Sequence, residues 1–470
     1  MSFIDKANRI YCIGLKGVGM TGLAQLLKAQ GKEVWGSDTT EKFFTDEVLH
    51  KAGLECWEGF TADHLNRPID LVIHSSAYNE EQVEVRAALN KKIPVLTYAQ
   101  ALAELVNAKK GLAVIGSHGK TTTTALLAHI LQTANLYPSA LVGSMVRTWQ
   151  GNALSGSGDW FVFEADEYQN KFQQYSPQGI ILTSIDWDHP DFFPTPQDYQ
   201  DAFVQFLKKL PAAGFIVACY DDPKVKQAIA QAGLKPEQLT TYGLTSGYWR
   251  MQRMWLEDGR WHFSVNEGQE YLGTFYFRLV GGHNVLNALA AMAAAKRLGV
   301  ELETIRQALI SFDGTVRRFE DKGKLTNGVS LVDDYAHHPG EIIATLKAAR
   351  AFYPYKNIRV VFHPHTFSRT KALLSDFGRA FAGADEVIAL DIYGSAREQT
   401  GGVSTADLVA ELHKNNIKVT YQPTIEQAAE YLISTVKRND LVITMGAGDV
   451  WRVGEELIKK FGLMNGSEFK

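Results

Sequence analysis

The sequence has little cysteine, no long apolar run and no marked excess of charge of either sign. Its three cysteines, Cys12, Cys56 and Cys219, show no CxxC spacing, so we expect small buried side chains and no disulfide framework. No apolar stretch approaches the roughly 18 residues that span a bilayer. The apolar run after Arg9 is broken too early by glycine to act as a signal sequence. We therefore expect a cytoplasmic protein with no membrane span.

The balance of charge argues against nucleic acid as a partner. Lysine and arginine total 48, aspartate and glutamate total 52, and the formal net charge is −4. Basic pairs such as Lys109-Lys110 and Arg317-Arg318 are isolated, whereas a protein that binds phosphate backbones usually gathers a basic stripe. We therefore expect no nucleic-acid partner.

The order of apolar and polar segments predicts three α/β domains. At about 150 residues per domain, 470 residues correspond to roughly three domains. Short β-branched runs alternate with helical patterns, which predicts parallel, doubly wound sheets. A charged break at 109–111 and a new strand series after residue 313 predict domains at 1–108, 109–313 and 314–470. Aromatic alternation around Asp258-Gly259 predicts a small antiparallel sheet within the central domain.

The first candidate site is a glycine-rich loop. Residues 14–22 read GLKGVGMTG, and Gly17, Gly19 and Gly22 fit GxGxxG between a predicted strand and a helix. Such glycines let the backbone approach a pyrophosphate at a helix N-terminus. Asp38 follows about 20 residues later, where a dinucleotide enzyme binds a ribose hydroxyl. A nicotinamide cofactor, another nucleotide diphosphate and a purely structural turn all remain open.

The second candidate site is a phosphate loop. Residues 116–124 read GSHGKTTTT after a buried strand, and Gly119-Lys120-Thr121 match the end of the loop. There the backbone N–H groups cradle phosphates, Lys120 reaches the β and γ oxygens, and Thr121 binds Mg²⁺. Val114 stands where the full motif has its first glycine. The segment predicts a nucleoside triphosphate site.

Two further strands end in residues suited to a metal. The predicted strand 160–164 ends in Glu164, which is placed like the metal-binding acid beside a phosphate loop. The predicted strand from residue 180 ends near His189, where a neutral imidazole could bind a cation or a phosphate. The alternative for His189 is a loop histidine with a structural role.

The third strand series carries histidine, aspartate and arginine at its strand ends. Residues 333–339 read DDYAHHP and residues 363–369 read HPHTFSR. Ligands bind at the carboxyl ends of parallel strands, so these segments indicate anion or carboxylate binding, with helix caps and turns as the alternative. A zinc site is less favoured because cysteine is missing and arginine is close by. Its candidate ligands would be His337, His338, His363 and His365.

Taken together, these motifs resemble the Mur ligases of peptidoglycan synthesis nearly from end to end. The matching segments are residues 14–24, 72–77 (VIHSSA), 116–124, 164–167, 185–189, 283–291 (HNVLNALAA), 317–319, 333–339, 363–370, 391–398 and 444–449 (TMGAGD). The resemblance implies an N-terminal Rossmann-like domain for a UDP-sugar, a central P-loop domain that binds ATP, and a C-terminal Rossmann-like ligase domain. Lys16 departs from the family pattern, since glycine usually occupies its position.

The resemblance also implies roles for individual residues. The UDP-sugar set is Gly14, Gly17, Val18, Gly19, Met20, Asp38, Ser75 and Ser76. The ATP set is Gly116, Ser117, His118, Gly119, Lys120, Thr121, Thr122, Asn287, Arg318 and Asp334. The metal set is Thr121, Glu164 and His189, and the catalytic set is Lys120, Glu164, His189, His338, His365 and Arg369.

The alanine-adding members of the family resemble the chain most closely. This implies that L-alanine is joined to the lactyl carboxylate of UDP-N-acetylmuramate through an acyl phosphate, with ATP and Mg²⁺ or Mn²⁺, in a monomer or homodimer. Residues 200–203 (QDAF) lack the carbamylated lysine of several relatives, as the alanine-adding members do. Residues 164–168 (EADEY) also resemble the ligase that recycles murein tripeptide. A dehydrogenase and a nucleotide-gated binding module are the more distant alternatives.

Overall fold

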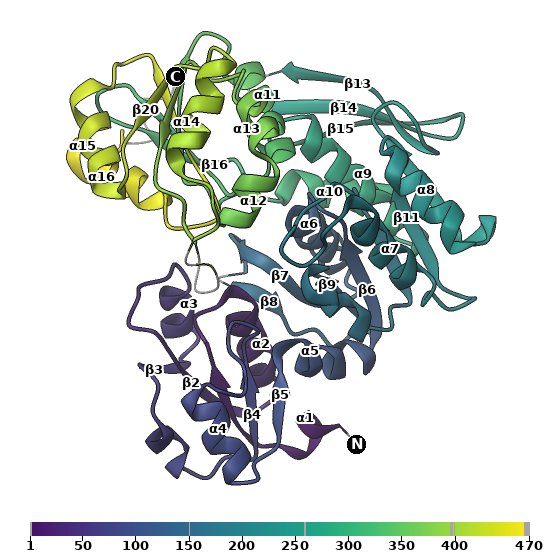
Figure 1. Cartoon of the computed structure of the whole chain (residues 1–470). Coiled ribbons are helices and arrows are strands. Elements are labelled where there is room, and N and C mark those ends of the chain that lie inside the picture. The colour runs from purple at the N-terminus through teal and green to yellow at the C-terminus, as the bar shows by residue number, and fades with distance from the viewer. Residues whose placement is uncertain (1, 150, 258–259, 395–397, 399, 465–470) are drawn as a thin grey trace. The chain divides into compact units, whose positions relative to one another are not determined.

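The computed structural model describes residues 2–149, 151–257, 260–394, 398 and 400–464. The chain divides into two compact units (Figure 1), each built from three stretches of sequence. The first unit comprises Met1–Asp186, Gln197–Arg278 and Val285–Thr315. The second comprises Trp187–Pro196, Leu279–Asn284 and Val316–Lys470. No helix in the described part of the chain is long and apolar enough to cross a membrane.

The first unit begins with a five-stranded parallel sheet in the order β3-β2-β1-β4-β5. Its strands are β1 (Arg9–Ile13), β2 (Glu33–Asp38), β3 (Glu55–Glu58), β4 (Leu71–His74) and β5 (Val95–Thr97). The helices are α1 (Phe3–Lys6), α2 (Val18–Ala29), α3 (Asp46–Lys51), α4 (Val83–Asn90) and α5 (Tyr98–Asn107), with a 3₁₀ turn at Ala62–Asn66. The strand order reverses beside β1, and such a reversal places a ligand crevice at the carboxyl ends of β1 and β4.

A ten-stranded mixed sheet forms the rest of the first unit, in the order β15-β14-β13-β12-β11-β10-β6-β9-β7-β8. Its strands are β6 (Lys110–Ile115), β7 (Ser139–Val146), β8 (Gly151–Leu154), β9 (Trp160–Glu164), β10 (Gly179–Leu182), β11 (Phe215–Cys219), β12 (Leu239–Gly243), β13 (Trp249–Glu257), β14 (Arg260–Glu267) and β15 (Glu270–Phe277). The helices are α6 (Lys120–Thr133), α7 (Pro196–Leu207), α8 (Pro223–Ala232), α9 (Gly282–Arg297) and α10 (Leu302–Ser311), with 3₁₀ turns at Tyr168–Gln174 and Pro236–Gln238.

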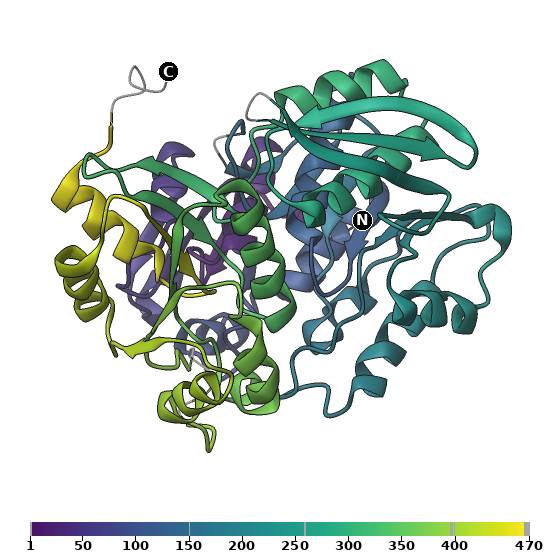
Figure 2. The ribbon, with the colours of Figure 1, turned by 90° about the horizontal axis from the view of Figure 1, so that it is seen from above.

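The antiparallel strands β13, β14 and β15 continue this sheet, because β13 pairs in parallel with β12. Figure 2 shows these three long strands side by side. The turn predicted at Asp258-Gly259 lies outside the described residues, and the strands on either side of it pair from Glu257↔Arg260 onward. The predicted antiparallel element is therefore present as an extension of the parallel sheet.

Local sequence signals explain where several elements start and stop. The last four residues of β6, Leu112–Ile115, are fully buried, as expected for an apolar strand covered on both faces. Helix α8 starts after Asp222, whose carboxylate accepts the N–H of Lys224 at 2.8 Å, and ends at Gly233 with φ +68°. The phosphate-loop segment therefore lies between a buried central strand and the long helix α6.

The second unit contains a six-stranded sheet in the order β16-β17-β21-β18-β19-β20. Its strands are β16 (Glu320–Lys324), β17 (Ser330–Asp334), β18 (Asn357–Phe362), β19 (Glu386–Ala389), β20 (Val419–Tyr421) and β21 (Asp440–Met445). The helices are α11 (Pro339–Phe352), α12 (Phe367–Ala372), α13 (Leu374–Ala380), α14 (Thr405–Lys414), α15 (Ile425–Thr435) and α16 (Trp451–Phe461). Only β16 runs antiparallel to its neighbour in the described sheet. The histidine-rich segments follow β17 and β18.

Candidate active site

The first glycine loop connects β1 to α2 and lies against the segment after β4. Gly14 has φ +82°, and a Cβ there would come within 2.8 Å of the Cβ of Ser75, so only glycine fits. Gly17 is the N-cap of α2, and Val18, Gly19 and Met20 form its first turn. This turn offers unpaired N–H groups and the positive end of a helix dipole. The structure thus brings the predicted UDP-sugar residues of the loop together with Ser75-Ser76.

The carboxylate of Asp38 holds this loop in place. It accepts the backbone N–H of Lys16 at 2.7 Å and that of Thr39 at 2.8 Å. The Lys16 side chain is only 4% exposed, and its amine donates to the carbonyls of Thr39 at 2.9 Å and Glu41 at 2.8 Å. The lysine that replaces the usual glycine therefore ties the loop to the segment after β2. Nothing in the sequence pattern predicts this contact.

The phosphate loop owes its shape to two glycines with positive φ. Gly116 has φ +128° and Gly119 has φ +79°, and a Cβ at these positions would collide with Thr183 and Asn287, respectively. The Thr183 hydroxyl donates to the carbonyl of His118 at 2.6 Å. His118 Nε2 lies 3.1 Å from Asp186 Oδ2. Asn287, predicted for the adenine, is thus next to the phosphate loop, and the loop is held by the residues that follow β10.

Lys120, the first residue of α6, is paired with an acid. Its amine donates to Glu167 Oε2 at 3.0 Å and to the carbonyls of Gly116 and Ser117. Burial alone would lower the pKa of Lys120, but Glu167 and the nearby Glu164 and Asp166 raise it. The amine is therefore charged at neutral pH and sits where an incoming phosphate would compete with Glu167 for it.

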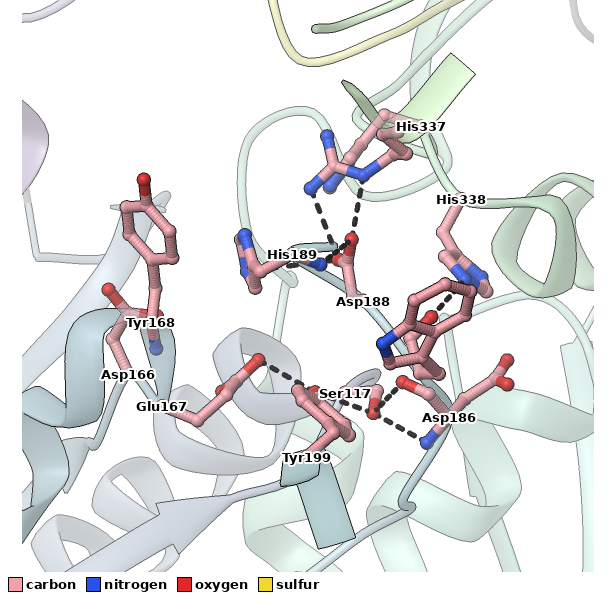
Figure 3. A network of polar contacts seen from close by, with 12 residues as sticks. Ser117, Asp166, Glu167, Tyr168, Asp186, Asp188, His189, Tyr199, His337 and His338 are labelled. Carbon is pink, nitrogen blue, oxygen red and sulfur yellow. Dashed lines mark hydrogen bonds and ion pairs between the residues drawn. The ribbon is translucent and has the colours of Figure 1, made fainter. Parts of the chain in front are cut away.

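A tyrosine and a serine complete the network around Glu167 (Figure 3). The Tyr199 hydroxyl donates to Glu167 Oε1 at 2.9 Å and lies 2.9 Å from Ser117 Oγ. Ser117 Oγ also donates to the carbonyl of Asp186 and accepts its N–H, both at 2.7 Å. Tyr199 is fully buried on α7. The network therefore links the phosphate loop to the acidic segment after β9.

Thr121 and Glu164 meet as the metal assignment requires. The Thr121 hydroxyl donates to Glu164 Oε2 at 2.9 Å, and the same oxygen accepts the N–H of Gly143 at 3.0 Å. A hydroxyl and a carboxylate at this separation are the oxygen ligands that Mg²⁺ prefers. The pair therefore fits a magnesium ion bound next to the nucleotide phosphates. His189, the third predicted ligand, belongs to the second unit.

In the second unit, Arg369 and Asp188 form a buried ion pair. Arg369 Nε donates to Asp188 Oδ1 at 2.7 Å and Nη2 donates to Oδ2 at 3.2 Å, with side chains 5% and 9% exposed. Burial alone would raise the pKa of Asp188, but Arg369, together with His189 and His338, holds it well below its usual value. The loop after β10 thus contributes a permanent negative charge to the second unit.

The predicted histidines lie around this pair. His338 caps α11: its Nδ1 accepts the N–H of Gly340 at 3.2 Å, and its Nε2 lies 3.2 Å from the carbonyl of Trp187. This assigns the ring proton to Nε2. His365 Nδ1 lies 3.3 Å from Arg369 Nη1. Burial, and then the charge of Arg369, hold the pKa of His365 well below its usual value. The ring of His365 can therefore accept or donate hydrogen bonds as a neutral group.

Arg317 and Arg318, which follow α10, have different surroundings. Arg317 is buried and donates to Asp333 Oδ2 and to the carbonyls of Gly446 and Gly448, which fixes the loop after β21. Arg318, predicted for the nucleotide, lies with its guanidinium 4.9 Å from the ring centre of Tyr335.

Asp334, also predicted for the nucleotide, is a buried carboxylate. It accepts the N–H groups of Phe319 at 2.8 Å and Ala336 at 2.7 Å. Burial raises the pKa of Asp334 to about 6. Its hydrogen bonds to the backbone on both sides of β17 hold the start of the DDYAHHP segment in place.

The predicted residues thus fall into one set per unit. The glycine loop, the phosphate loop, Glu164 and Asn287 belong to the first unit, and His189, Arg318, Asp334, His338, His365 and Arg369 belong to the second. Sequence reasoning did not assign roles to Glu167, Asp188 or Tyr199. Glu167 and Asp188 lie inside the motifs that had been singled out, whereas Tyr199 carries no sequence signal.

Comparisons with known proteins identify the family of the chain. Three family models match: "Mur ligase family, catalytic domain" at residues 9–110, "Mur ligase middle domain" at 114–295, and "Mur ligase, glutamate ligase domain" at 317–448. The UDP-N-acetylmuramate--L-alanine ligase of Desulfitobacterium hafniense is 40% identical over 453 residues, which cover 96% of this chain and 99% of that protein.

Solved structures give the same result. The UDP-N-acetylmuramate-alanine ligase of Thermotoga maritima has a TM-score of 0.82 at 25% identity, over 96% of this chain and 98% of that one. A murein peptide ligase from Psychrobacter arcticus has a TM-score of 0.75 at 24% identity, over 97% and 99% of the two chains, and shares the fold. Because the three family models together match most of its length, and a relative 40% identical to it is matched over 96% of it, the chain belongs to the Mur ligase family.

Proposed function

We propose that the protein is an ATP-dependent ligase that joins L-alanine to the lactyl carboxylate of UDP-N-acetylmuramate. The observation that carries this proposal is the 40% identity, over 96% of the chain, to a relative named UDP-N-acetylmuramate--L-alanine ligase. The phosphate loop supports the use of ATP, because Lys120 is charged and Thr121 lies 2.9 Å from the acid Glu164. We infer that the reaction takes place in the cytoplasm, where ATP and sugar nucleotides are made, and that the enzyme is a monomer or a homodimer.

The chemistry follows from the poor reactivity of a carboxylate toward amines. A lactyl carboxylate oxygen first attacks the γ-phosphorus of ATP, which forms an acyl phosphate and releases ADP. The neutral amine of L-alanine then attacks the acyl carbon, loses a proton, and expels phosphate. Negative charge develops on the transferring phosphoryl group, and we assign its stabilisation to Lys120.

The metal of this reaction would be Mg²⁺, with Mn²⁺ as a substitute of similar ligand preference. Thr121 and Glu164 would hold it, and His189 of the second unit is the proposed third ligand. When bound, the metal neutralises charge on the phosphate oxygens. In the described structure Glu164 is held by Thr121 and by the N–H of Gly143. These bonds orient the carboxylate before any ligand arrives.

We propose binding roles for the remaining predicted residues. The Gly14–Met20 loop, Asp38 and the Ser75-Ser76 segment would bind the UDP-sugar. Arg318 and Asp334 would contact the nucleotide. Arg369, which Asp188 orients through two hydrogen bonds, would face the reacting carboxylate together with His338 and His365.

The test is phosphate release by the purified protein with ATP, Mg²⁺ and UDP-N-acetylmuramate, in parallel with L-alanine, murein tripeptide or no acceptor. We expect release only with L-alanine, and a product heavier by one alanyl residue. Release only with tripeptide would assign the protein to peptide recycling, for which residues 164–168 (EADEY) are the motivating observation. A change in nicotinamide absorbance without phosphate release would refute the ligase proposal.

A further inference from the structure

One buried asparagine joins the first glycine loop to the central domain. Asn152 lies on β8 and is 0% exposed. Its side-chain amide donates to the carbonyl of Val18 at 2.8 Å and to the carbonyl of Val142 at 2.9 Å. Val18 is the first residue of α2, directly after the glycine loop, and Val142 lies on β7. A single side chain therefore connects the proposed UDP-sugar loop to the sheet that carries the ATP site.

The third glycine of the loop motif allows this contact. A Cβ at Gly22 would lie 2.7 Å from Asn152 Nδ2 and would also collide with the side chain of Leu141. Real Cβ atoms do not approach other heavy atoms so closely, so α2 can lie against β7 and β8 only with glycine at this position. Gly22 therefore serves the docking of the loop helix on the central domain.

The path continues from Val142 to the metal-binding acid. The next residue, Gly143, donates its N–H to Glu164 Oε2 at 3.0 Å, and Thr121 donates to the same oxygen at 2.9 Å. A Cβ at Gly143 would collide with this carboxylate. Four residues in succession, Asn152, Val142, Gly143 and Glu164, thus connect Val18 to Thr121 of the phosphate loop within one compact unit.

The hydrogen bonding of Asn152 indicates why an amide stands here. Both of its N–H groups are used, while its Oδ1 has no hydrogen-bond partner among the described residues. An unpaired buried acceptor is unfavourable, so an apolar side chain would serve better if the position only needed to be filled. The two donated bonds, one to each domain, are what distinguish asparagine from such a residue.

We propose that Asn152 is a positioning residue that couples the two nucleotide sites, so that a ligand at the glycine loop and a ligand at the phosphate loop strengthen each other's binding. A sugar nucleotide bound at the glycine loop restricts the motion of Val18. Through the hydrogen bonds of Asn152, this also restricts Val142 and Gly143, and therefore the carboxylate of Glu164. The proposal rests on the proposed function, since it takes the glycine loop as the sugar-nucleotide site. By linkage, the effect on the two affinities is equal in both directions.

The experiment measures the dissociation constant of ADP with Mg²⁺ by calorimetry, with and without saturating UDP-N-acetylmuramate. For the unaltered full chain we expect at least about fivefold tighter binding of ADP when the sugar nucleotide is present, and the same factor in the reverse titration. In Asn152→Ala, and in the isosteric Asn152→Asp, whose side chain cannot donate these hydrogen bonds, the dissociation constants of ADP with and without the sugar nucleotide should differ by less than about twofold. Asn266→Ala, an asparagine of β14, is the matched control and should keep the full factor.

A factor of one in the unaltered protein, or an unchanged factor in both Asn152 variants, would overturn the inference. Binding of ADP without any binding of UDP-N-acetylmuramate would instead overturn the proposed function. A measurement on the unaltered protein covers the case in which the variants do not fold: hydrogen exchange at the N–H of Gly143 should slow when UDP-N-acetylmuramate alone is added. No change in that exchange rate would count against the coupling.

Discussion

Replacement of Asp188 by asparagine should lower the free energy of unfolding of the second unit by about 3 kcal/mol or more. The carboxylate accepts three hydrogen bonds, two from Arg369 at 2.7 and 3.2 Å and one from the N–H of His189 at 2.7 Å. Both partners of the ion pair are less than one tenth exposed. The variant leaves the guanidinium of Arg369 buried without its hydrogen-bonded carboxylate, and this poorly compensated charge dominates the loss.

A double-mutant cycle isolates the interaction between the two side chains. Asp188→Asn, Arg369→Met and the double variant are compared by urea unfolding, and we expect a coupling energy of about 2 kcal/mol or more. Because Arg369 holds the pKa of Asp188 well below its usual value, the loss of stability caused by Asp188→Asn alone should be the same at pH 7 and pH 5. The exposed pair Asp376 and Arg379 is the matched control, and Asp376→Asn should change stability by about 0.5 kcal/mol or less.

A coupling energy below about 0.5 kcal/mol would refute this reasoning, because that is the range of solvent-screened surface pairs. A loss of stability in Asp188→Asn that shrinks between pH 7 and pH 5 would also contradict it, since the carboxylate of the unaltered protein would then be taking up a proton in this range.

Three further predictions concern other positions. Lys120→Ala should lower the rate of phosphate release by about 10³-fold or more, since a charge that stabilises the phosphoryl group is lost; a loss of only tenfold would contradict the role. Lys16→Met should raise the KM for UDP-N-acetylmuramate by about tenfold or more with little change in kcat, because the carbonyls of Thr39 and Glu41 lose a charged donor. Steady-state kinetics measures this, and an unchanged KM would count against the role of Lys16. Burial lowers the pKa of His337 to about 4, so as the pH falls from 7 to 5 the unfolded chain gains a proton that the folded state does not bind. This histidine should therefore lower the free energy of unfolding by about 2 kcal/mol over that range. In urea unfolding, His337→Gln should make the free energy of unfolding depend less on pH. Equal dependence on pH in the two proteins would disprove the lowered pKa of His337.

Local parts of the site could be predicted from the sequence because their signals are local. The phosphate loop is an example: its glycine spacing, lysine and threonines all lie within one turn of a helix start, and the observed α6 begins at Lys120. The pairing of Thr121 with Glu164 also followed, because β6 and β9 are neighbouring parallel strands and Glu164 ends the second of them.

Contacts between distant segments could not be predicted in the same way. Asp188 and Arg369 are 181 positions apart, and no periodicity or motif spacing relates them. The amine of Lys16 donates to backbone carbonyls. Every residue has such a carbonyl, so no particular residue type in the sequence indicates this contact. Tyr199 was hidden for a third reason: a tyrosine on the apolar face of a helix looks like ordinary core until its hydroxyl is seen to reach Glu167.

The composition of the second unit from three stretches of chain has a practical consequence for work with fragments. A gene fragment that encodes only Val316–Lys470 would contain Arg369 but not the stretch Trp187–Pro196, which supplies Asp188. Such a polypeptide would carry Arg369 without the carboxylate that forms its buried ion pair. Domain swaps between relatives, and crystallisation of the C-terminal part alone, should therefore carry residues 187–196 along, for example as a tethered peptide ahead of the fragment.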